Sequence, residues 1–187
     1  MIRIRNIEEL EAERERQLNA WREAGEDVEL FIFNLTDADL SNTNLIGADL
    51  NVTNFERANL SGTNLSGADL QASNFYKADL RGANLSGADL CNADLWRATV
   101  SGADLSGADL KWASFWNADL SWSDLRGSKL SGSDLRGAKL EGTKITDDLI
   151  EYPFKEGVRV TQSQYNEIQL KYGVAFMDGF VIKKTDS

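Results

Sequence analysis

A five-residue repeat runs through the chain from Leu35 to Ile145 without an insertion or deletion. A large apolar residue, the centre of each repeat, occupies every fifth position: eighteen are Leu, three Phe, one Val and one Ile. Two residues before the centre, every position from Ala38 to Thr143 holds Ala, Ser or Thr. The position between is mostly Asp or Asn, and Gly is common two residues after the centre. This strict odd period restricts the possible folds more than any other feature of the sequence.

A period of five fits neither regular secondary structure as a continuous element. On an α-helix five residues advance by about 500°, so successive centres would scatter around the cylinder. On one continuous strand, alternate centres would point to opposite faces. A short strand with its small residue and its centre inward, followed by a two-residue corner, keeps every centre on one side. The repeat therefore predicts a polygonal coil, with Gly supplying positive φ at corners.

A second period, four times as long as the first, predicts the number of sides in each coil. Four five-residue sides per coil would bring residues 20 positions apart into stacked columns, so the 23 centres make just under six coils. At a strand spacing of about 4.8 Å the rod would be roughly 28 Å long. Three sets of similar residues recur at multiples of 20: Phe55, Phe75 and Phe115; Tyr76, Trp96 and Trp116; Arg57, Lys77 and Arg97.

The recurring sequence A(D/N)LxG, seen as ANLSG at 83–87 and ADLSG at 103–107, resembles the repeat of the pentapeptide repeat family. The resemblance covers residues 31–145, which is more than half of the chain. It implies an all-β solenoid, a right-handed quadrilateral parallel β-helix of about six coils, with Leu65 and Ala68 among its inward residues. Family members with assigned roles act mostly by binding other proteins, and some protect DNA gyrase by imitating DNA. The resemblance implies no catalytic residues.

Residues outside the repeat are expected to cover the ends of the solenoid, because its last coils expose unpaired backbone and core. Asn6 followed by Glu9 predicts an N-cap with a reciprocal partner. The helix should then run from Ile7 to Ala24 and stop at Gly25. Its apolar residues Ile7, Leu10, Leu18 and Trp21 should lie roughly on one face, which Arg14 interrupts. The chain thus divides into an N-terminal helix and cap, the β-helix and a C-terminal capping segment, over residues 1–30, 31–145 and 146–187.

The C-terminal segment departs most from the repeat. Its stretch QSQYNEIQLKYG predicts a short helix ending at Gly173, and VAFMDGFVIKK predicts a hairpin with its turn at Asp178–Gly179. A small mixed cap is one interpretation of this segment, and an element for dimerisation or partner binding is the other. A homodimer formed through a β-helix end is therefore open.

Residues suited to catalysis or metal binding are sparse. Histidine is absent, which removes the commonest general base and zinc ligand. Cys91, at a corner, has no histidine to activate it. Four Asp residues would stack in one column: Asp49, Asp69, Asp89 and Asp109. Such a column could attract Ca²⁺, but the Gly-Gly-x-Gly-x-Asp spacing of calcium-binding solenoids is missing. We therefore predict no catalytic, cofactor-binding or metal-binding residues, and no enzyme.

The charge and the apolar pattern exclude further classes of partner. The net charge is −10, so direct binding of nucleic acid is not expected, because phosphate contacts need a cationic surface. Nowhere are there 18 consecutive apolar residues, so no membrane partner is expected. The single cysteine fits a reducing compartment, which favours a cytoplasmic protein.

Five Trp residues occur and none is a centre, although Trp is costly to expose. Trp96 and Trp116 directly follow their centres beneath Tyr76, and Trp112 lies at the preceding corner. Two interpretations are open: a ladder that stiffens neighbouring coils, or a patch that binds a partner. We call the candidate residues the aromatic-basic patch: Arg57, Tyr76, Lys77, Trp96, Arg97, Lys111, Trp112 and Trp116.

Two functions follow from these observations. The leading hypothesis is a non-enzymatic protein-binding scaffold or regulator, whose partner is an acidic or mixed-charge protein docked on the aromatic-basic patch. The alternative is a DNA-mimicking protein that binds a type II topoisomerase such as DNA gyrase, as the resemblance allows. Mimicry needs a sustained anionic surface, which is interrupted by cations in the last coils: Arg126, Lys129, Arg136, Lys139 and Lys144.

Overall fold

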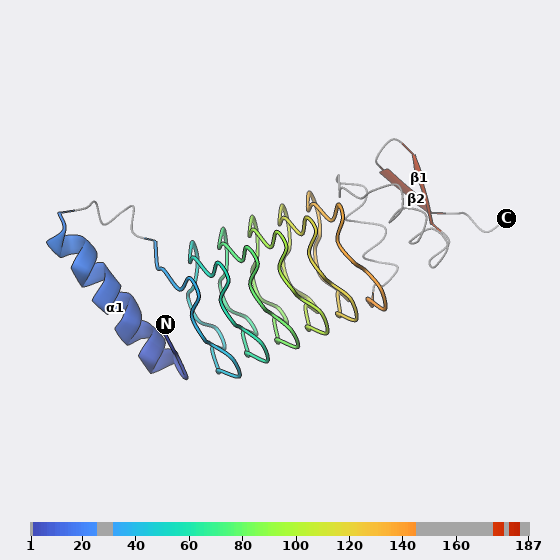
Figure 1. Cartoon of the computed structure of the whole chain (residues 1–187). Coiled ribbons are helices and arrows are strands. Elements are labelled where there is room, and N and C mark those ends of the chain that lie inside the picture. Colours follow the sequence, from blue (N-terminus) through green and yellow to red (C-terminus); the bar gives the residue numbers. More distant parts are fainter. Residues whose placement is uncertain (1, 26–31, 145–173, 178–179, 184–187) are drawn as a thin grey trace.

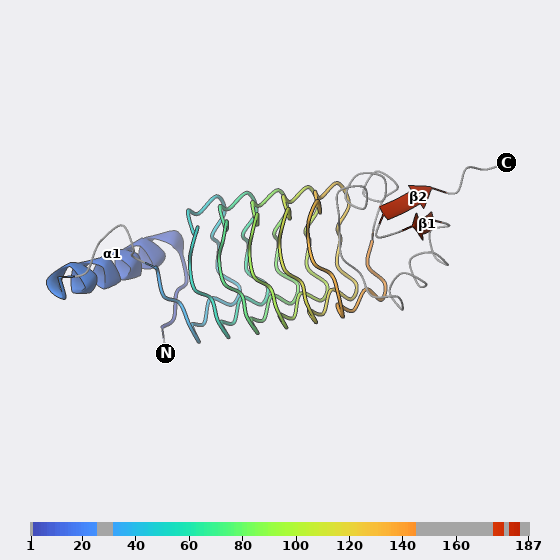
Figure 2. The ribbon, with the colours of Figure 1, turned by 90° about the horizontal axis from the view of Figure 1, so that it is seen from above.

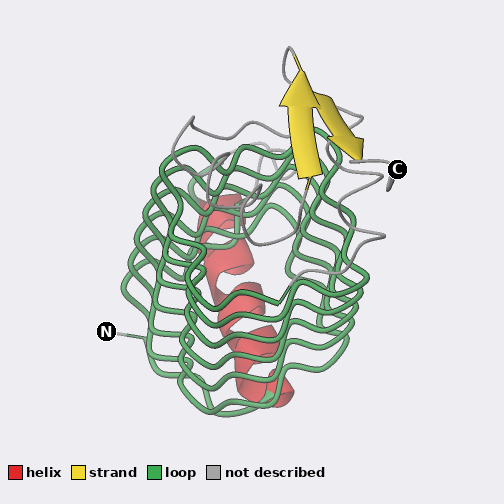
Figure 3. Ribbon diagram, turned by 90° about the vertical axis from the view of Figure 1, so that its right-hand side faces the viewer, coloured by secondary structure: helices red, strands yellow, loops and turns green. Residues whose placement is uncertain are grey.

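A stack of coils forms the body of the molecule (Figures 1 and 2). The helix α1 (Ile7–Glu23) lies at its first coil, and the strands β1 (Val174–Met177) and β2 (Phe180–Lys183) lie beyond its last one. Viewed along the stack, the coils superimpose in one four-sided outline (Figure 3). The computed structural model describes residues 2–25, 32–144, 174–177 and 180–183.

On each side of a coil, one residue forms a parallel backbone bridge to the residue 20 positions later, in the next coil. These bridges run from Asn34↔Asn54 to Asp124↔Lys144. The period of 20 and the four-sided coil predicted from the sequence are therefore confirmed. We number the sides in chain order, and each corner takes the number of the side before it; in the first coil, sides 1 to 4 are centred on Leu35, Leu40, Leu45 and Leu50.

The interior is filled as the repeat predicts. Every centre from Leu35 to Leu140 is buried, and so is every small residue from Ala38 to Thr143. Where the small residue is polar, its hydroxyl bonds to backbone: Ser73 Oγ donates to the carbonyl of Leu50 at 2.7 Å. An Ala or a Ser leaves room for the large centre beside it, which is why the chain places its smallest residues inside the coil.

The second residue of every described corner has positive φ, from residue 37 to residue 142. Gly occupies eleven of these corners, and eleven carry another residue. The exceptions include the β-branched Val52, with φ +52°, and two tryptophans, Trp112 (+60°) and Trp122 (+64°). A side chain in this left-handed conformation costs about 1–2 kcal/mol. The sequence predicted this conformation only for glycine, whereas the corner imposes it on every residue type.

The predicted N-terminal helix is present, with small differences at its ends. Asn6 is the N-cap, and its side-chain oxygen accepts the N–H of Glu9 at 2.8 Å. The Glu9 carboxylate accepts the N–H of Arg5 rather than that of Asn6. Helical residues end at Glu23, one residue earlier than predicted, and Gly25 follows with φ +74°.

The face of α1 toward the coils differs from the predicted one. Of the four residues expected there, only Leu10 is buried; Leu18 and Trp21 are half-buried and Ile7 is exposed. Glu13 is buried instead and accepts a hydrogen bond from Gln17 Nε2 at 2.9 Å. A helix that projects past the coils on a slant (Figure 1) buries only the residues of its near half.

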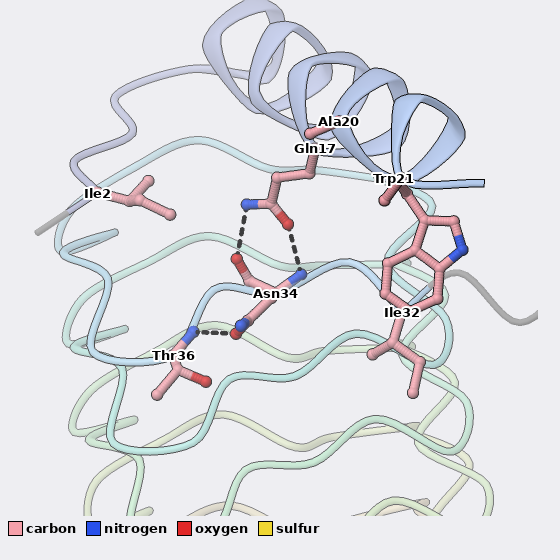
Figure 4. Close-up of a pocket in the computed structure, with 8 residues that line it drawn as sticks. Ile2, Gln17, Ala20, Trp21, Ile32, Asn34 and Thr36 are labelled. Carbon is pink, nitrogen blue, oxygen red and sulfur yellow. Dashed lines mark hydrogen bonds between the residues drawn. The ribbon is translucent and has the colours of Figure 1, made fainter. Parts of the chain in front are cut away.

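Residues before the repeat supply hydrogen bonds to the first coil. Asp39 N donates to Ile2 O at 2.8 Å and Ile4 N donates to Asp39 O at 3.1 Å, as a preceding coil would. The side-chain amide of Gln17 acts as a second substitute for a peptide group. Its Nε2 donates to Asn34 O at 2.8 Å and its Oε1 accepts Asn34 N at 2.9 Å (Figure 4). That α1 prevents coil ends from associating stays a prediction.

The predicted C-terminal hairpin is confirmed. The strands β1 and β2 pair antiparallel, with Val174 opposite Lys183 and Met177 opposite Phe180. This register leaves two residues for the turn, as the Asp178–Gly179 pair predicted. The turn itself and the short helix predicted before Gly173 lie outside the described residues.

Candidate functional site

Corner 1 carries a ladder of three aromatic rings. The ring centroids of Tyr76 and Trp96 are 4.8 Å apart with planes tilted by 37°, and those of Trp96 and Trp116 are 5.4 Å apart with planes at 12°. Parallel bridges on side 1 hold successive coils in register, which places these residues in one column. The stacking expected from the spacing of one coil is confirmed.

Two cations of the aromatic-basic patch lie on this ladder. Lys77 Nζ is 4.8 Å from the Tyr76 ring centroid, and Arg97 Cζ is 5.2 Å from the Trp96 ring centroid. Each cation directly follows its aromatic residue at the left-handed corner position. These cation–π contacts neutralise no charge, but they hold the two side chains along the rod.

Arg57 forms ion pairs and does not lie on the aromatic ladder. Its Nε and Nη2 donate to the two carboxylate oxygens of Asp37 at 2.8 and 2.7 Å, and it also pairs with Glu56. These hydrogen bonds lower the pKa of Asp37 and raise the pKa of Arg57 further above its usual value. Asp37 stands one coil before Arg57 in the same column, so the column rule that predicted the ladder also accounts for this ion pair.

Lys111 and Trp112 lie at corner 4, on the other edge of side 1 from the ladder. Lys111 Nζ is 3.1 Å from Asp109 Oδ2, and this hydrogen bond raises the pKa of Lys111. Trp112 is 65% exposed, and its ring lies against Gly132, where a Cβ would clash with it. The predicted patch therefore has two parts, one on each edge of side 1.

Trp122 is an exposed tryptophan outside the predicted aromatic-basic patch. It lies at corner 2, is 66% exposed, and covers Gly142 as Trp112 covers Gly132. Its place two repeats after Trp112, at the same position of a corner, was the signal that could have identified it. With Trp116, which is 47% exposed, three tryptophans surround a single coil.

The outward charges change sign along the rod. Residues 32–110 carry ten acidic and four basic side chains, whereas residues 111–144 carry four acidic and six basic ones. Later cations pair with carboxylates one coil before them, as Lys129 does with Asp109 and Lys139 with Asp119, both at 3.3 Å, or with carboxylates two residues before them, as Arg136 does with Asp134. The anionic surface is thus largely neutralised over the last coils.

Side chains that could support catalysis are poorly placed among the described residues. The Asp column aligns as predicted, but no group of carboxylates there is arranged to hold a metal ion. Cys91 is half-buried; burial, together with its hydrogen bond to Asp109 at 3.2 Å, raises the pKa of its thiol to about 12. A thiol with so high a pKa is not a nucleophile at neutral pH.

A groove of about 700 Å³ opens between α1 and the first coil (Figure 4). Trp21 and Ile32 face each other across it, and the Gln17–Asn34 pair closes one side. No ionisable side chain of the described residues lines this groove, so its described lining offers no general acid or base.

The described part of the chain also contains no helix with the length and hydrophobicity needed to cross a membrane.

Comparisons with known proteins identify the repeat. The family model for pentapeptide repeats matches in eight copies, over residues 34–71, 73–111 and 103–142. A search of curated protein sequences found no match. The family assignment therefore depends on the repeat itself, which spans more than half of the chain.

Several solved structures are similar to this chain. A pentapeptide repeat protein (Rfr23) from the cyanobacterium Cyanothece 51142 is 27% identical, with a TM-score of 0.41, over 72% of this chain and 96% of that one. HetL from the cyanobacterium Nostoc sp. strain PCC 7120, involved in heterocyst differentiation regulation, is 30% identical, with a TM-score of 0.27, over 69% and 64%. QnrB1, a plasmid-mediated fluoroquinolone resistance protein, is 20% identical, with a TM-score of 0.38, over 79% and 98%.

Proposed function

Because the chain belongs to the pentapeptide repeat family, we propose that it is a non-enzymatic scaffold that presents its β-helical surface to a protein partner. The partner docks on the aromatic-basic patch, across side 1. The observation that carries this proposal is the exposure of Trp112 and Trp116 on the two edges of that side, at 65% and 47%.

Folding does not require these tryptophans. Equivalent positions elsewhere hold Ser, Gly or Asn, and Trp112 adopts its left-handed conformation at a cost that Gly would avoid. Trp is among the residues that contribute most to protein interfaces, where one buried anchor is worth about 2 kcal/mol or more. A partner that covers both tryptophans would recover their exposed apolar area.

The experiment is to replace Trp112 and Trp116 together with Ser. Partners are captured from lysate with the wild type and the variant, and thermal unfolding of both proteins is measured. We expect loss of specific partners with a melting temperature close to that of the wild type. Trp122→Ser is the matched control, because Trp122 has the same exposure and corner conformation as Trp112 but lies off side 1. Retained partners with a lowered melt would assign the tryptophans a structural role alone.

One observation favours DNA mimicry as a second candidate function. The Asp column of side 4 and the excess of acidic residues over 32–110 give the first coils an anionic surface. The ion pairs of the later coils limit its length to part of the rod. A DNA gyrase supercoiling assay with the purified chain tests this candidate: inhibition or protection at stoichiometric amounts supports it, and no effect rejects it.

A further inference from the structure

The aromatic–cation pattern of corner 1 breaks at its last ring. Tyr76 is followed by Lys77 and Trp96 by Arg97, and each cation lies over its ring. Trp116 is followed by Asn117, and no described cation lies over the Trp116 ring. The backbone does not explain the change, because φ at Asn117 is +56°, close to the +58° of Arg97.

Arg136, the residue one coil after Trp116 in the column of the rings, does not lie over the Trp116 ring. Its Nε and Nη2 donate to the carboxylate of Asp134. This hydrogen bonding raises the pKa of the Arg136 guanidinium further above its usual value. Trp116 is accordingly 47% exposed, whereas Trp96, stacked between two rings, is half-buried.

Side 1 carries a carboxylate one coil before Trp116. Asp94, on side 1 beside the ladder, accepts the N–H of Trp96 through Oδ1 at 2.9 Å and makes no ion pair with a described residue. Two of the four cations of the aromatic-basic patch are paired with carboxylates, Arg57 with Asp37 and Lys111 with Asp109, whereas Lys77 and Arg97 lie over rings. The two paired cations are therefore poorly available to an acidic partner, and the whole chain carries a net charge of −10.

We propose that the Trp116 ring is the binding position for an arginine or lysine side chain of the protein partner. The partner cation takes the place over the ring that Lys77 and Arg97 take over theirs, with Asp94 one coil before it on side 1. This inference rests on the proposed function and deepens it. It narrows the acidic or mixed-charge partner expected from the sequence to one whose contact segment is basic.

The decisive variant supplies the missing cation from the chain itself. Asn117→Arg restores the pattern of corner 1, and the fold tolerates Arg at the equivalent positions 57 and 97. Asn42→Arg is the matched control, since φ there is also +56° and it adds the same charge at corner 2 of the first coil. Circular-dichroism melting curves establish that both variants fold.

The probes are two capped peptides, Gly-Arg-Gly-Arg-Gly and Gly-Glu-Gly-Glu-Gly, added to the full ¹⁵N-labelled chain. The readout is the NMR signal of the Trp116 indole N–H, assigned by its loss in Trp116→Ser. We expect the arginine peptide to shift this signal progressively as its concentration rises and the glutamate peptide to leave it unchanged. Asn117→Arg should weaken binding about two- to fivefold, as an exposed cation–π contact predicts, and Asn42→Arg should not.

Three results would overturn the inference: no shift of the Trp116 signal by the arginine peptide, equal shifts by both peptides, or equal affinity of the two variants. These results are separable from failure of the proposed function. Partners lost on replacing Trp112 and Trp116, with an unresponsive Trp116 signal, would keep the docking surface and reject the cation. A responsive signal with partners retained would keep the cation position at Trp116 and reject the docking surface.

Discussion

Corner 1 and corner 3 share one backbone conformation and carry different surfaces. At corner 3 the pair Ser–Gly recurs at residues 66–67, 86–87 and 106–107, and its glycines have φ between +65° and +69°. At corner 1 of two successive coils the same two positions hold an aromatic residue and a cation, with φ of +57° at Lys77 and +58° at Arg97. Corner 3 therefore shows what the fold needs at a corner, and corner 1 shows what has been added to it.

The additions at corner 1 change stability little in total. A side chain other than Gly at a left-handed position costs about 1–2 kcal/mol, although Asn and Asp adopt it more readily. A stacked aromatic pair contributes about 0.5–1.5 kcal/mol beyond its buried area, and a cation–π contact about 0.5–1 kcal/mol. Because these quantities nearly offset each other, stability alone does not account for the ladder.

The largest effect is expected inside the coil, beside the Ser–Gly corner. Ala88→Leu places a large side chain where Ala88 is fully buried, and should destabilise the fold by about 1–3 kcal/mol or more. Ser86→Leu, two residues away at corner 3, should change stability by no more than about 0.5 kcal/mol. Chemical denaturation measures both. Similar losses for the two variants would show that the inward and outward positions are wrongly assigned.

An intermediate effect is expected from adding a methyl group to two corner glycines. Gly87→Ala at corner 3 meets no neighbour and should cost about 1–2 kcal/mol through its positive φ alone. Gly132→Ala should cost roughly 1 kcal/mol more, because its Cβ displaces the Trp112 ring. Thermal unfolding of Gly132→Ala with and without Trp112→Ser completes the cycle. If removal of the ring does not abolish the extra cost, the ring does not rest on the glycine.

The smallest effect concerns the one arginine of corner 3, Arg126. Its hydrogen bonds to Asp124 lower the pKa of that carboxyl from 3.8 to about 2. A folded-state pKa below the unfolded one stabilises the fold above about pH 4, and this contribution is lost as the pH falls toward 2. Asp124→Asn should therefore reduce the loss of unfolding free energy between pH 4 and pH 2. The reduction should be less than about 1 kcal/mol, because the arginine of the pair is exposed. Chemical denaturation across this pH range measures it.

Asp104→Asn is the control for this comparison. Asp104 lies one coil before Asp124 on the same side and accepts a similar N–H, from Ser106 at 2.9 Å, but forms no ion pair with a described residue. The change of slope in Asp104→Asn measures the effect of losing a carboxylate that accepts this N–H without an ion pair. An identical change of slope in both variants would remove the ion pair as its cause.

The periodicity of the sequence predicted most of the fold because each residue type has one environment in every coil. The inward positions, the four sides and the ladder follow from counting in fives and twenties. The backbone of the corners was predicted only in part, since Val52 and Trp112 have side chains that normally resist positive φ. Their conformation is imposed by bonds between coils, such as Trp112 N to Ser131 O at 2.9 Å, which no local propensity reveals.

The candidate site was predicted less completely than the fold. The columns located Tyr76, Trp96 and Trp116, but the engagement of Arg57 by Asp37 was overlooked. Side chains of adjacent coils choose their partners by geometry within about 5 Å, and several rotamers are open to a long cation. The sequence therefore identified which residues could meet, and the structure showed which of them do.

The constant length of the coil makes the surface of this chain depend on residue number in an unusual way. A duplication of one whole coil would lengthen the rod and keep every later residue in its column. A duplication of a single repeat, equally compatible with the interior, would turn everything after it by one side; inserted between Trp96 and Trp116, it would separate the Trp116 ring from the other two. Evolution can thus rearrange the outer surface of such a rod by changing the length of its gene, without altering one side chain.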